Sequence, residues 1–208
     1  MNPAAASTAA PGPSTAIALG ANLGDPLATL TAVRPLLSQV LQHWAGADPA
    51  VGSWRLRWSP LFRTAPVGGP AGQPPYLNAV LLASHPGDEG AAAAAPSGGD
   101  PLPLLLALQS LEAAFGRQRL QPWGPRSLDL DLLWCGGHRR QSAALWLPHP
   151  LYLERTFVLA PLAALAPELV PPDAGRRVDE LLAELLAAGQ DDGSPPPQRL
   201  APQVGWPE

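Results

Sequence analysis

The segment WGPRSLDLDLLW, at residues 123–134, constrains the fold more strongly than any other stretch of the chain. Successive side chains of a strand point to opposite faces, so its alternate leucines would share one face and Asp129 and Asp131 the other. Aspartate is depleted in strands, and two carboxylates roughly 7 Å apart repel each other unless a cation or solvent compensates them. The segment therefore predicts a half-buried strand whose polar face is either simply solvated or holds a cation.

The other apolar patterns predict an ordered series of strands and helices. We expect strands at 14–20, 51–62, 76–83, 127–134 and 143–147, and helices after Asp25 and at 103–115, 157–170 and 178–188. The first six elements run β, α, β, β, α, β, which is the order of a split βαβ unit. The sequence therefore predicts an α+β fold with a ferredoxin-like core, in which helices flank a mostly antiparallel sheet in three α/β/α layers.

Composition divides the chain into one domain and three low-complexity segments. Residues 1–13 and 190–208 are expected to be a disordered extension and a flexible tail, and residues 14–189 to form the domain. Residues 85–101 read as a low-complexity insertion within that domain. The Gly- and Pro-rich segment at 63–75 is too long and irregular for a tight hairpin turn, so we expect a functional loop there.

Charge and residue usage exclude several classes of protein. A net charge of −4 argues against a general nucleic-acid binder. All 13 Lys and Arg residues are arginine, which excludes a P-loop and lysine Schiff-base chemistry. A single cysteine, Cys135, cannot form an intramolecular disulfide, and neither a secretory signal nor a membrane span is apparent. We therefore expect a cytoplasmic protein without a membrane or nucleic-acid partner.

Three arginines, Arg117, Arg119 and Arg126, precede the paired aspartates in a loop. They could form ordinary ion pairs on a surface. Alternatively, Mg²⁺ takes one or two protein carboxylates and completes its shell with water and phosphate oxygens, while arginines bind further phosphate oxygens. The second interpretation predicts a site for a metal–polyphosphate complex.

Four blocks carry a family resemblance: GANLGDP (20–26), FRTAPVGGPAGQPPYLNAV (62–80), LEAAFGRQRLQPWGPRSLDLDLL (111–133) and LPHPLYLERTFVLAPLAALAPELVPP (147–172). In this order they resemble the 6-hydroxymethyl-7,8-dihydropterin pyrophosphokinases of folate biosynthesis, over roughly residues 15–187 apart from the insertion. The resemblance implies Mg²⁺-dependent transfer of pyrophosphate from ATP, the co-substrate, to the dihydropterin, with release of AMP. The implied partners are these two small molecules, and we expect the protein to act as a monomer.

The resemblance assigns roles to matching residues. Asp129 and Asp131 match ligands of two Mg²⁺ ions, and with Arg117 and Arg126 they form the catalytic set. The residues that match the nucleotide side are Gln109, Glu112, Arg117, Arg119, Trp123, Arg126, His149 and Arg155. Those that match the pterin side are Thr64, Val67, Tyr76, Asn78 and Phe157, with Tyr76 and Phe157 stacking on the ring.

Other interpretations stay open for several of these residues. His149 taken singly is typical of a structural histidine, and Tyr76 and Phe157 of core aromatics. Departures from the family pattern stand at four positions, Ala21, Phe62, Ala65 and Pro122. The alternative functions are a two-metal phosphohydrolase or nuclease, and a non-catalytic interaction protein that recruits partners through its proline-rich segments.

Overall fold

The computed structural model describes residues 15–44, 54–84, 99–118, 123–189 and 195–207. In these parts of the chain a six-stranded sheet has the order β5-β1-β4-β3-β8, with β2 also paired to β4. The strands are β1 (Thr15–Ala21), β2 (Arg55–Trp58), β3 (Phe62–Thr64), β4 (Tyr76–Ser84), β5 (Asp129–Cys135) and β8 (Gln198–Arg199). Every pairing within this sheet is antiparallel.

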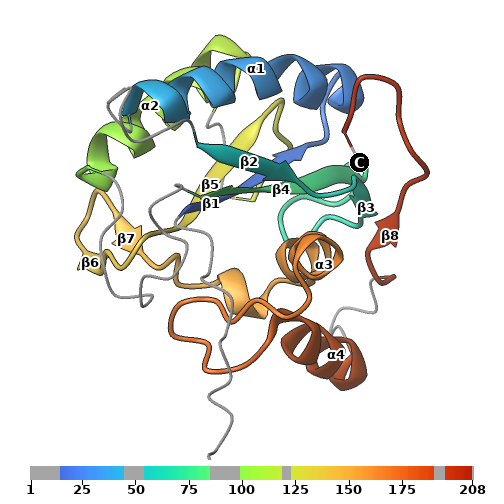
Figure 1. Ribbon diagram of the computed structural model, residues 1–208. Coiled ribbons are helices and arrows are strands. Elements are labelled where there is room, and N and C mark those ends of the chain that lie inside the picture. The colour runs from blue at the N-terminus through green and yellow to red at the C-terminus, as the bar shows by residue number, and fades with distance from the viewer. Residues whose placement is uncertain (1–14, 45–53, 85–98, 119–122, 190–194, 208) are drawn as a thin grey trace, which may run out of the picture.

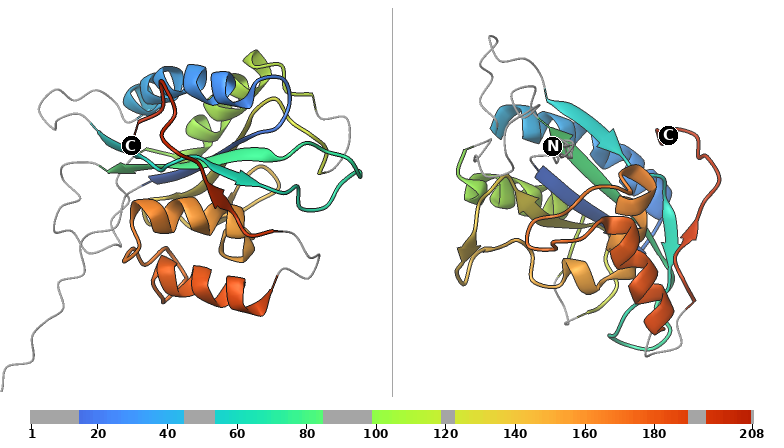
Figure 2. Two further views of the ribbon diagram at one scale, coloured as in Figure 1. Left: turned by 90° about the vertical axis from the view of Figure 1, so that its right-hand side faces the viewer. Right: turned by 60° about the horizontal axis from the view of Figure 1, so that its bottom comes forward.

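Helices cover both faces of the sheet (Figures 1 and 2). Helices α1 (Pro26–Trp44) and α2 (Pro101–Ala114) lie on one face, and α3 (Thr156–Leu165) lies on the other with α4 (Val178–Ala188) packed beside it. A short hairpin of β6 (Arg140–Gln141) and β7 (Trp146–Leu147) and the 3₁₀ helix η2 (Tyr152–Glu154) connect β5 to α3. The predicted three-layer α+β fold is therefore confirmed. No helix in the described ranges is long and apolar enough to cross a membrane.

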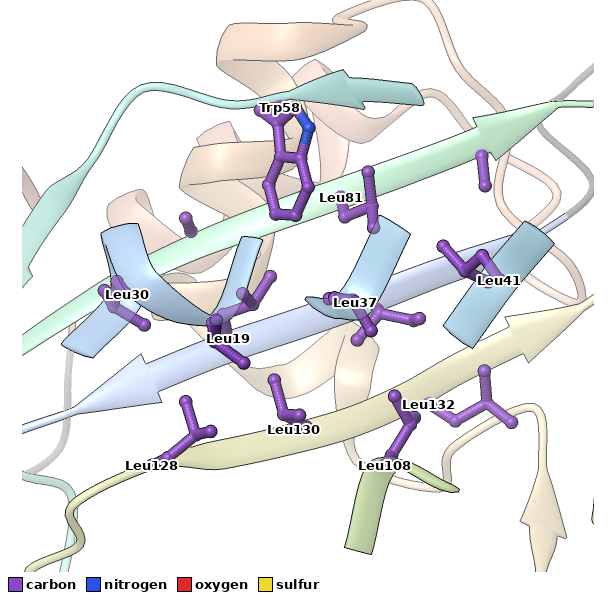
Figure 3. Packing of buried hydrophobic residues seen from close by; sticks show 14 of the residues in the cluster. Leu19, Leu30, Leu37, Leu41, Trp58, Leu81, Leu108, Leu128, Leu130 and Leu132 are labelled. Carbon is purple, nitrogen blue, oxygen red and sulfur yellow. The ribbon is translucent and has the colours of Figure 1, made fainter. Parts of the chain in front are cut away.

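Leucines from α1 and the sheet form the larger core (Figure 3). The buried α1 residues are Leu30, Val33, Leu37 and Leu41, at the spacing of one helix face. They pack against Leu19 of β1 and the alternate leucines of β5. Burying one such side chain contributes about 1.5–3 kcal/mol, so this layer holds the central strands firmly in place.

The alternation predicted for residues 127–132 is confirmed. Leu128, Leu130 and Leu132 belong to the core beneath α1 and α2. Asp129 and Asp131 line a cavity on the opposite face, beside the start of α3. A shift in register between Ala16 and Ile17 interrupts the alternation only after Leu132.

Two of the predicted strands are longer than the strands in the structure. The strand expected at 51–62 is two strands, β2 and β3, and residues 51–53 lie outside the described parts. The break falls at Ser59 and Pro60, because the Ser59 hydroxyl accepts the hydrogen bond of Val80 N (2.9 Å) and proline has no N–H to donate. The strand expected at 143–147 is only Trp146–Leu147.

Helix α2 begins two residues earlier than the pattern at 103–115 predicts. Asp100 caps it, accepting a hydrogen bond from Leu102 N (3.1 Å), and Pro101 occupies the first turn, where no N–H is required. The end of the predicted 85–101 insertion therefore belongs to a helix. Residues 85–98, like the predicted N-terminal extension, lie outside the described parts of the chain.

The prediction of a flexible tail at 190–208 is wrong for residues 195–207. Strand β8 pairs with β3, and Leu200 N donates to Leu61 O (2.8 Å). Trp206 is buried, donates from its indole to Ser59 O (2.8 Å), and meets Trp58 edge-on with ring centroids 5.7 Å apart. The segment therefore supplies the edge strand next to β3, as the red trace in Figure 1 shows.

Candidate active site

The small residues of β1 form the floor of the candidate site. Gly20 lies between Asp129 of β5 and Asn78 of β4 in the sheet register. Two residues before Gly20 in β1, Ala18 pairs with Asp131 on the β5 side. A cavity of about 240 Å³ opens above this floor. The acidic residues of β5 and the amide of β4 therefore flank an open strip that is one strand wide.

Arginines surround the two carboxylates of β5. Arg117 pairs with one oxygen of Asp129 and Arg126 with the other, while Arg155 pairs with Asp131 at 3.3 Å. Glu112 is buried, pairs with Arg117 and accepts a hydrogen bond from Leu130 N (2.8 Å). Because Glu112 is anchored to the β5 backbone, it fixes the guanidinium of Arg117 beside Asp129.

Burial makes the charge on Asp131 costly. It raises the pKa of Asp131 to about 6, with a further upward contribution from the neighbouring carboxylate of Asp129. The guanidiniums of Arg155, Arg126 and Arg117 oppose that rise. A divalent cation between the two carboxylates would offset both the desolvation cost and the mutual repulsion, so the site is electrostatically suited to bind one.

The opposite side of the floor offers a fixed amide. Asn78 Nδ2 donates to Thr64 Oγ1 (2.7 Å), which orients the amide. A Cβ atom at Gly20 would stand 2.8 Å from Asn78 Oδ1, so only glycine leaves this amide in place. The floor therefore requires glycine at position 20 for steric reasons.

Aromatic side chains lie around the cavity. Tyr76 comes from the start of β4 and donates from its hydroxyl to Gly124 O (3.2 Å), and Phe157 comes from the first turn of α3. The guanidinium of Arg155 is 5.5 Å from the ring centroid of Phe157 and 5.9 Å from that of Trp123. Flat apolar faces and cations thus share one cavity, as a planar polar ligand with an anionic partner requires.

The structure brings most of the predicted residues together. Those that line the cavity are Thr64, Val67, Tyr76, Asn78, Trp123, Arg126, Asp129, Asp131, Arg155 and Phe157. Arg117 and Glu112 stand behind Asp129 rather than in the lining. Arg119 lies outside the described residues.

His149 and Gln109 occupy other positions. His149 lines an adjoining groove, and its Nδ1 accepts a hydrogen bond from Leu151 N (3.2 Å). Burial, with a contribution from Arg155, lowers the pKa of His149 to about 4, so the ring is neutral at physiological pH. Gln109 is exposed on α2 and lines neither the cavity nor this groove.

Sequence reasoning missed two residues that shape the site, Gly20 and Asn22. Both lie in the GANLGDP block, which was singled out for its resemblance without a role for either residue. Gly20 leaves the space above the floor, and Asn22 contacts loops from both sides of the cavity. An asparagine directly after an apolar strand was the available signal, but its partners are distant in sequence.

The donor set fits a hard divalent cation. Among the described residues no cluster of three or more His, Cys, Asp or Glu side chains is available to hold a metal. Two carboxylates suffice for Mg²⁺, because it keeps several waters and takes phosphate oxygens from a substrate. Asp129 and Asp131 meet that requirement, and the surrounding arginines supply further positive charge for phosphate oxygens.

Comparison with known proteins gives consistent results. The model of the family "7,8-dihydro-6-hydroxymethylpterin-pyrophosphokinase (HPPK)" matches residues 16–167. The 2-amino-4-hydroxy-6-hydroxymethyldihydropteridine pyrophosphokinase of Pseudomonas aeruginosa is 38% identical over 167 residues, covering 80% of this chain and 88% of that protein. The protein of the same name from Synechocystis is 35% identical over 171 residues, covering 81% and 74%.

Solved structures share the fold at low sequence identity. A Plasmodium falciparum HPPK-DHPS triple mutant crystallised with pteroate has a TM-score of 0.54 at 12% identity, covering 88% of this chain. A second HPPK-DHPS triple mutant, with SDX-DHP, has a TM-score of 0.57 at 10% identity, covering 89%. This chain spans 45% and 46% of the length of those two chains. From the family match and the relatives' identities, the chain belongs to the 7,8-dihydro-6-hydroxymethylpterin-pyrophosphokinase family, whose members are diphosphotransferase enzymes.

Proposed function

We propose that this enzyme transfers the pyrophosphoryl group of ATP to 6-hydroxymethyl-7,8-dihydropterin in the presence of Mg²⁺. The products are AMP and the dihydropterin diphosphate. The observation that carries the proposal is the floor at Gly20, which separates the carboxylates of β5 from the amide of β4 by a single strand. A nucleotide polyphosphate above one side and a flat ring above the other would meet over that floor.

On the β5 side, the chain supplies charge and alignment. Asp129 and Asp131 would hold two Mg²⁺ ions, which neutralise the triphosphate when bound. Arg117 and Arg126 already lie beside Asp129, and each can turn a guanidinium edge to a phosphate oxygen. Phosphoryl-type transfer depends on positioning and electrostatic stabilisation more than on a protein nucleophile, which agrees with the residues present.

Further contacts on the nucleotide side are assigned by position. Arg155 and Trp123 line the cavity beside Asp131, and His149 lies in the adjoining groove, next to β7. Glu112 acts through Arg117, whereas Gln109 and Arg119 remain assigned by family resemblance only. These residues are proposed to hold the nucleotide while the arginines hold its phosphates.

On the β4 side, the chain supplies recognition of the ring. Tyr76 and Phe157 offer stacking faces, and Asn78, held by Thr64, offers an oriented amide edge. An unpaired polar group in a closed pocket costs about 1–3 kcal/mol, so a heteroaromatic ring with matching donors and acceptors is selected over an apolar one. Val67, exposed in the loop before β4, is proposed to contact the ring edge.

We further propose that residues 14–189 with the packed 195–207 segment act as a monomer in the cytoplasm. The proposed substrates are two small molecules, and no nucleic acid or membrane takes part. The net charge of −4 and the single buried cysteine support this assignment.

The function is tested by incubating the protein with ATP, Mg²⁺ and 6-hydroxymethyl-7,8-dihydropterin and separating the nucleotides. We expect AMP to form only when all three are present, and EDTA to abolish it. Hydrolysis of ATP without pterin would instead favour a phosphohydrolase. Absence of any turnover, with a folded protein, would favour the non-catalytic alternative.

A further inference from the structure

Asn22 follows β1 directly and is buried, with only 3% of its surface exposed. Its side chain makes two hydrogen bonds of opposite kind. Oδ1 accepts from Arg126 N (2.7 Å), and Nδ2 donates to Pro74 O (3.0 Å). Its backbone N–H donates to Arg126 O at 3.0 Å. One side chain therefore joins two loops that are far apart in the sequence.

These loops belong to the two sides of the candidate site. The arginine loop (residues 123–128) carries Arg126, whose guanidinium pairs with Asp129. The pterin-side loop (residues 65–75) leads directly into Tyr76. Asn22 holds the backbone of the first at the residue whose side chain reaches the carboxylate, and the backbone of the second two residues before the proposed stacking ring.

Further contacts between the loops depend on this spacing. Gln73 Nε2 donates to Trp123 O (3.1 Å), and Tyr76 donates to Gly124 O (3.2 Å). A Cβ atom at Gly69 would stand 2.2 Å from Trp123 O, so the loop backbones touch with no room for a side chain. Small changes in the separation of the loops would therefore break several contacts at once.

The chemistry at position 22 requires a carboxamide. The N–H of Arg126 needs an acceptor, and the carbonyl of Pro74 needs a donor. An amide supplies one of each on adjacent atoms, whereas a carboxylate supplies acceptors only. Asn22 is buried and both hydrogen bonds are partly buried, so losing either one costs free energy and the position favours an amide over a carboxylate.

We propose that Asn22 is a positioning residue that fixes the separation of the arginine loop and the pterin-side loop. It thereby aligns the phosphate-facing side of the cavity with the ring-stacking side. Its catalytic consequence rests on the proposed pyrophosphoryl transfer. Its structural consequence, protection of the Arg126 amide, does not.

Two substitutions separate the two side-chain hydrogen bonds of Asn22, one to Arg126 N and one to Pro74 O. Asn22→Asp keeps the acceptor for Arg126 N and loses the donor to Pro74 O, so the KM for pterin should rise about tenfold with kcat nearly unchanged. Asn22→Ala removes both hydrogen bonds. The KM for pterin should rise to the same extent, and kcat should also fall by about tenfold or more. Gln203→Glu is the matched control, because Gln203 also donates an amide hydrogen to a backbone carbonyl, Ala201 O at 2.8 Å, but away from the cavity.

Hydrogen exchange of single amides, followed by NMR in the ligand-free protein, provides the second readout. Exchange at Arg126 should accelerate in Asn22→Ala and stay near the wild-type rate in Asn22→Asp. Amides of the central strand β4 should be unchanged in both variants, which excludes general loosening. If Asn22→Ala does not fold, Asn22→Asp alone tests the proposal. Its KM for pterin should rise while its kcat and the exchange of its β4 amides stay near the wild-type values.

The outcomes distinguish this inference from the proposed function. Wild-type protein that forms no AMP would refute the proposed function. Hydrogen exchange at Arg126 would still test whether Asn22 holds the arginine loop in place. Unchanged protection of Arg126 in Asn22→Ala would overturn the inference. A loss of kcat in both variants without any change in the KM for pterin would overturn it as well, since that pattern reflects general damage to the fold.

Discussion

Replacing Asp131 with asparagine separates the electrostatic cost of this carboxylate from its proposed use. Burial and the neighbouring Asp129 raise the pKa of Asp131 from 3.8 to about 6. The folded protein therefore binds this proton more tightly than the unfolded chain does. The resulting stabilisation is fully present below about pH 4 and is lost as the pH rises through about 6, where Asp131 ionises.

The pKa sets the size of the effect. A rise of about two units corresponds to at most ~3 kcal/mol at neutral pH, and this already contains the ion pair with Arg155. Because the Asp131 side chain is 31% exposed, solvent screens part of this cost. We therefore expect Asp131→Asn to raise the free energy of unfolding of the metal-free protein by about 1–2 kcal/mol at pH 7.5, with no change near pH 4.

Activity should move in the opposite direction. If Asp131 is the proposed metal ligand, its loss removes charge neutralisation that contributes several kcal/mol, so turnover should fall by roughly 100-fold to 1000-fold. Urea unfolding in EDTA at pH 4 and 7.5, and AMP formation at saturating Mg²⁺, measure both effects on one preparation.

The matched control is Asp173→Asn, which makes the same chemical change in an exposed ion pair with Arg139. It should alter stability by less than about 0.5 kcal/mol and leave turnover intact. Wild-type turnover in Asp131→Asn would refute the metal role of Asp131. A variant destabilised at pH 7.5 would refute the electrostatic argument.

Four further predictions concern the floor, the ring, the C-terminal segment and the insertion. Gly20→Ala should displace the amide of Asn78 and weaken pterin binding about tenfold or more, as measured by titration calorimetry. Gly99→Ala is the control and should not change binding, because a Cβ there meets nothing within 4 Å. Phe157→Ala should weaken pterin binding by about 1–3 kcal/mol and nucleotide binding far less; equal losses of both would identify a core residue. Trp206→Ala should lower the free energy of unfolding by about 3–5 kcal/mol in urea, and an unchanged midpoint would contradict the packing of this segment. Replacing residues 86–97 with a short Gly/Ser link should leave the melting temperature and turnover nearly unchanged. A large loss of folded protein would show that this segment is not a dispensable insertion.

Local periodicity in the sequence predicted the elements that depend on it. The alternation at residues 127–132 located β5 and its polar face correctly, because one buried face imposes a period of two. The strand predicted at 51–62 ran across Pro60, a visible signal of a break, whereas the contact of the Ser59 hydroxyl with Val80 N exists only once β4 lies beside it. Trp206 escaped prediction, since its partners Trp58 and Arg34 come from the other end of the chain.

The same distinction holds for the candidate site. The paired aspartates and the nearby arginines are recognisable from residue type and spacing, and the structure does bring them into contact. Gly20 and Asn22 are not recognisable in that way, because their importance depends on strand register and on loops that approach from distant parts of the chain. Sequence indicates which groups can do chemistry, whereas the residues that make room for them require the fold.

In the proposed reaction, both terminal phosphates of ATP move together to the pterin. The most direct measurement uses two ATP preparations, one labelled at the β-phosphate and one at the γ-phosphate, each incubated with Mg²⁺ and 6-hydroxymethyl-7,8-dihydropterin. We predict that both labels appear in the pterin product and that unlabelled AMP is released. Transfer of the γ label alone with formation of labelled ADP from the β preparation, or release of either label as free phosphate, would refute the proposed pyrophosphoryl transfer.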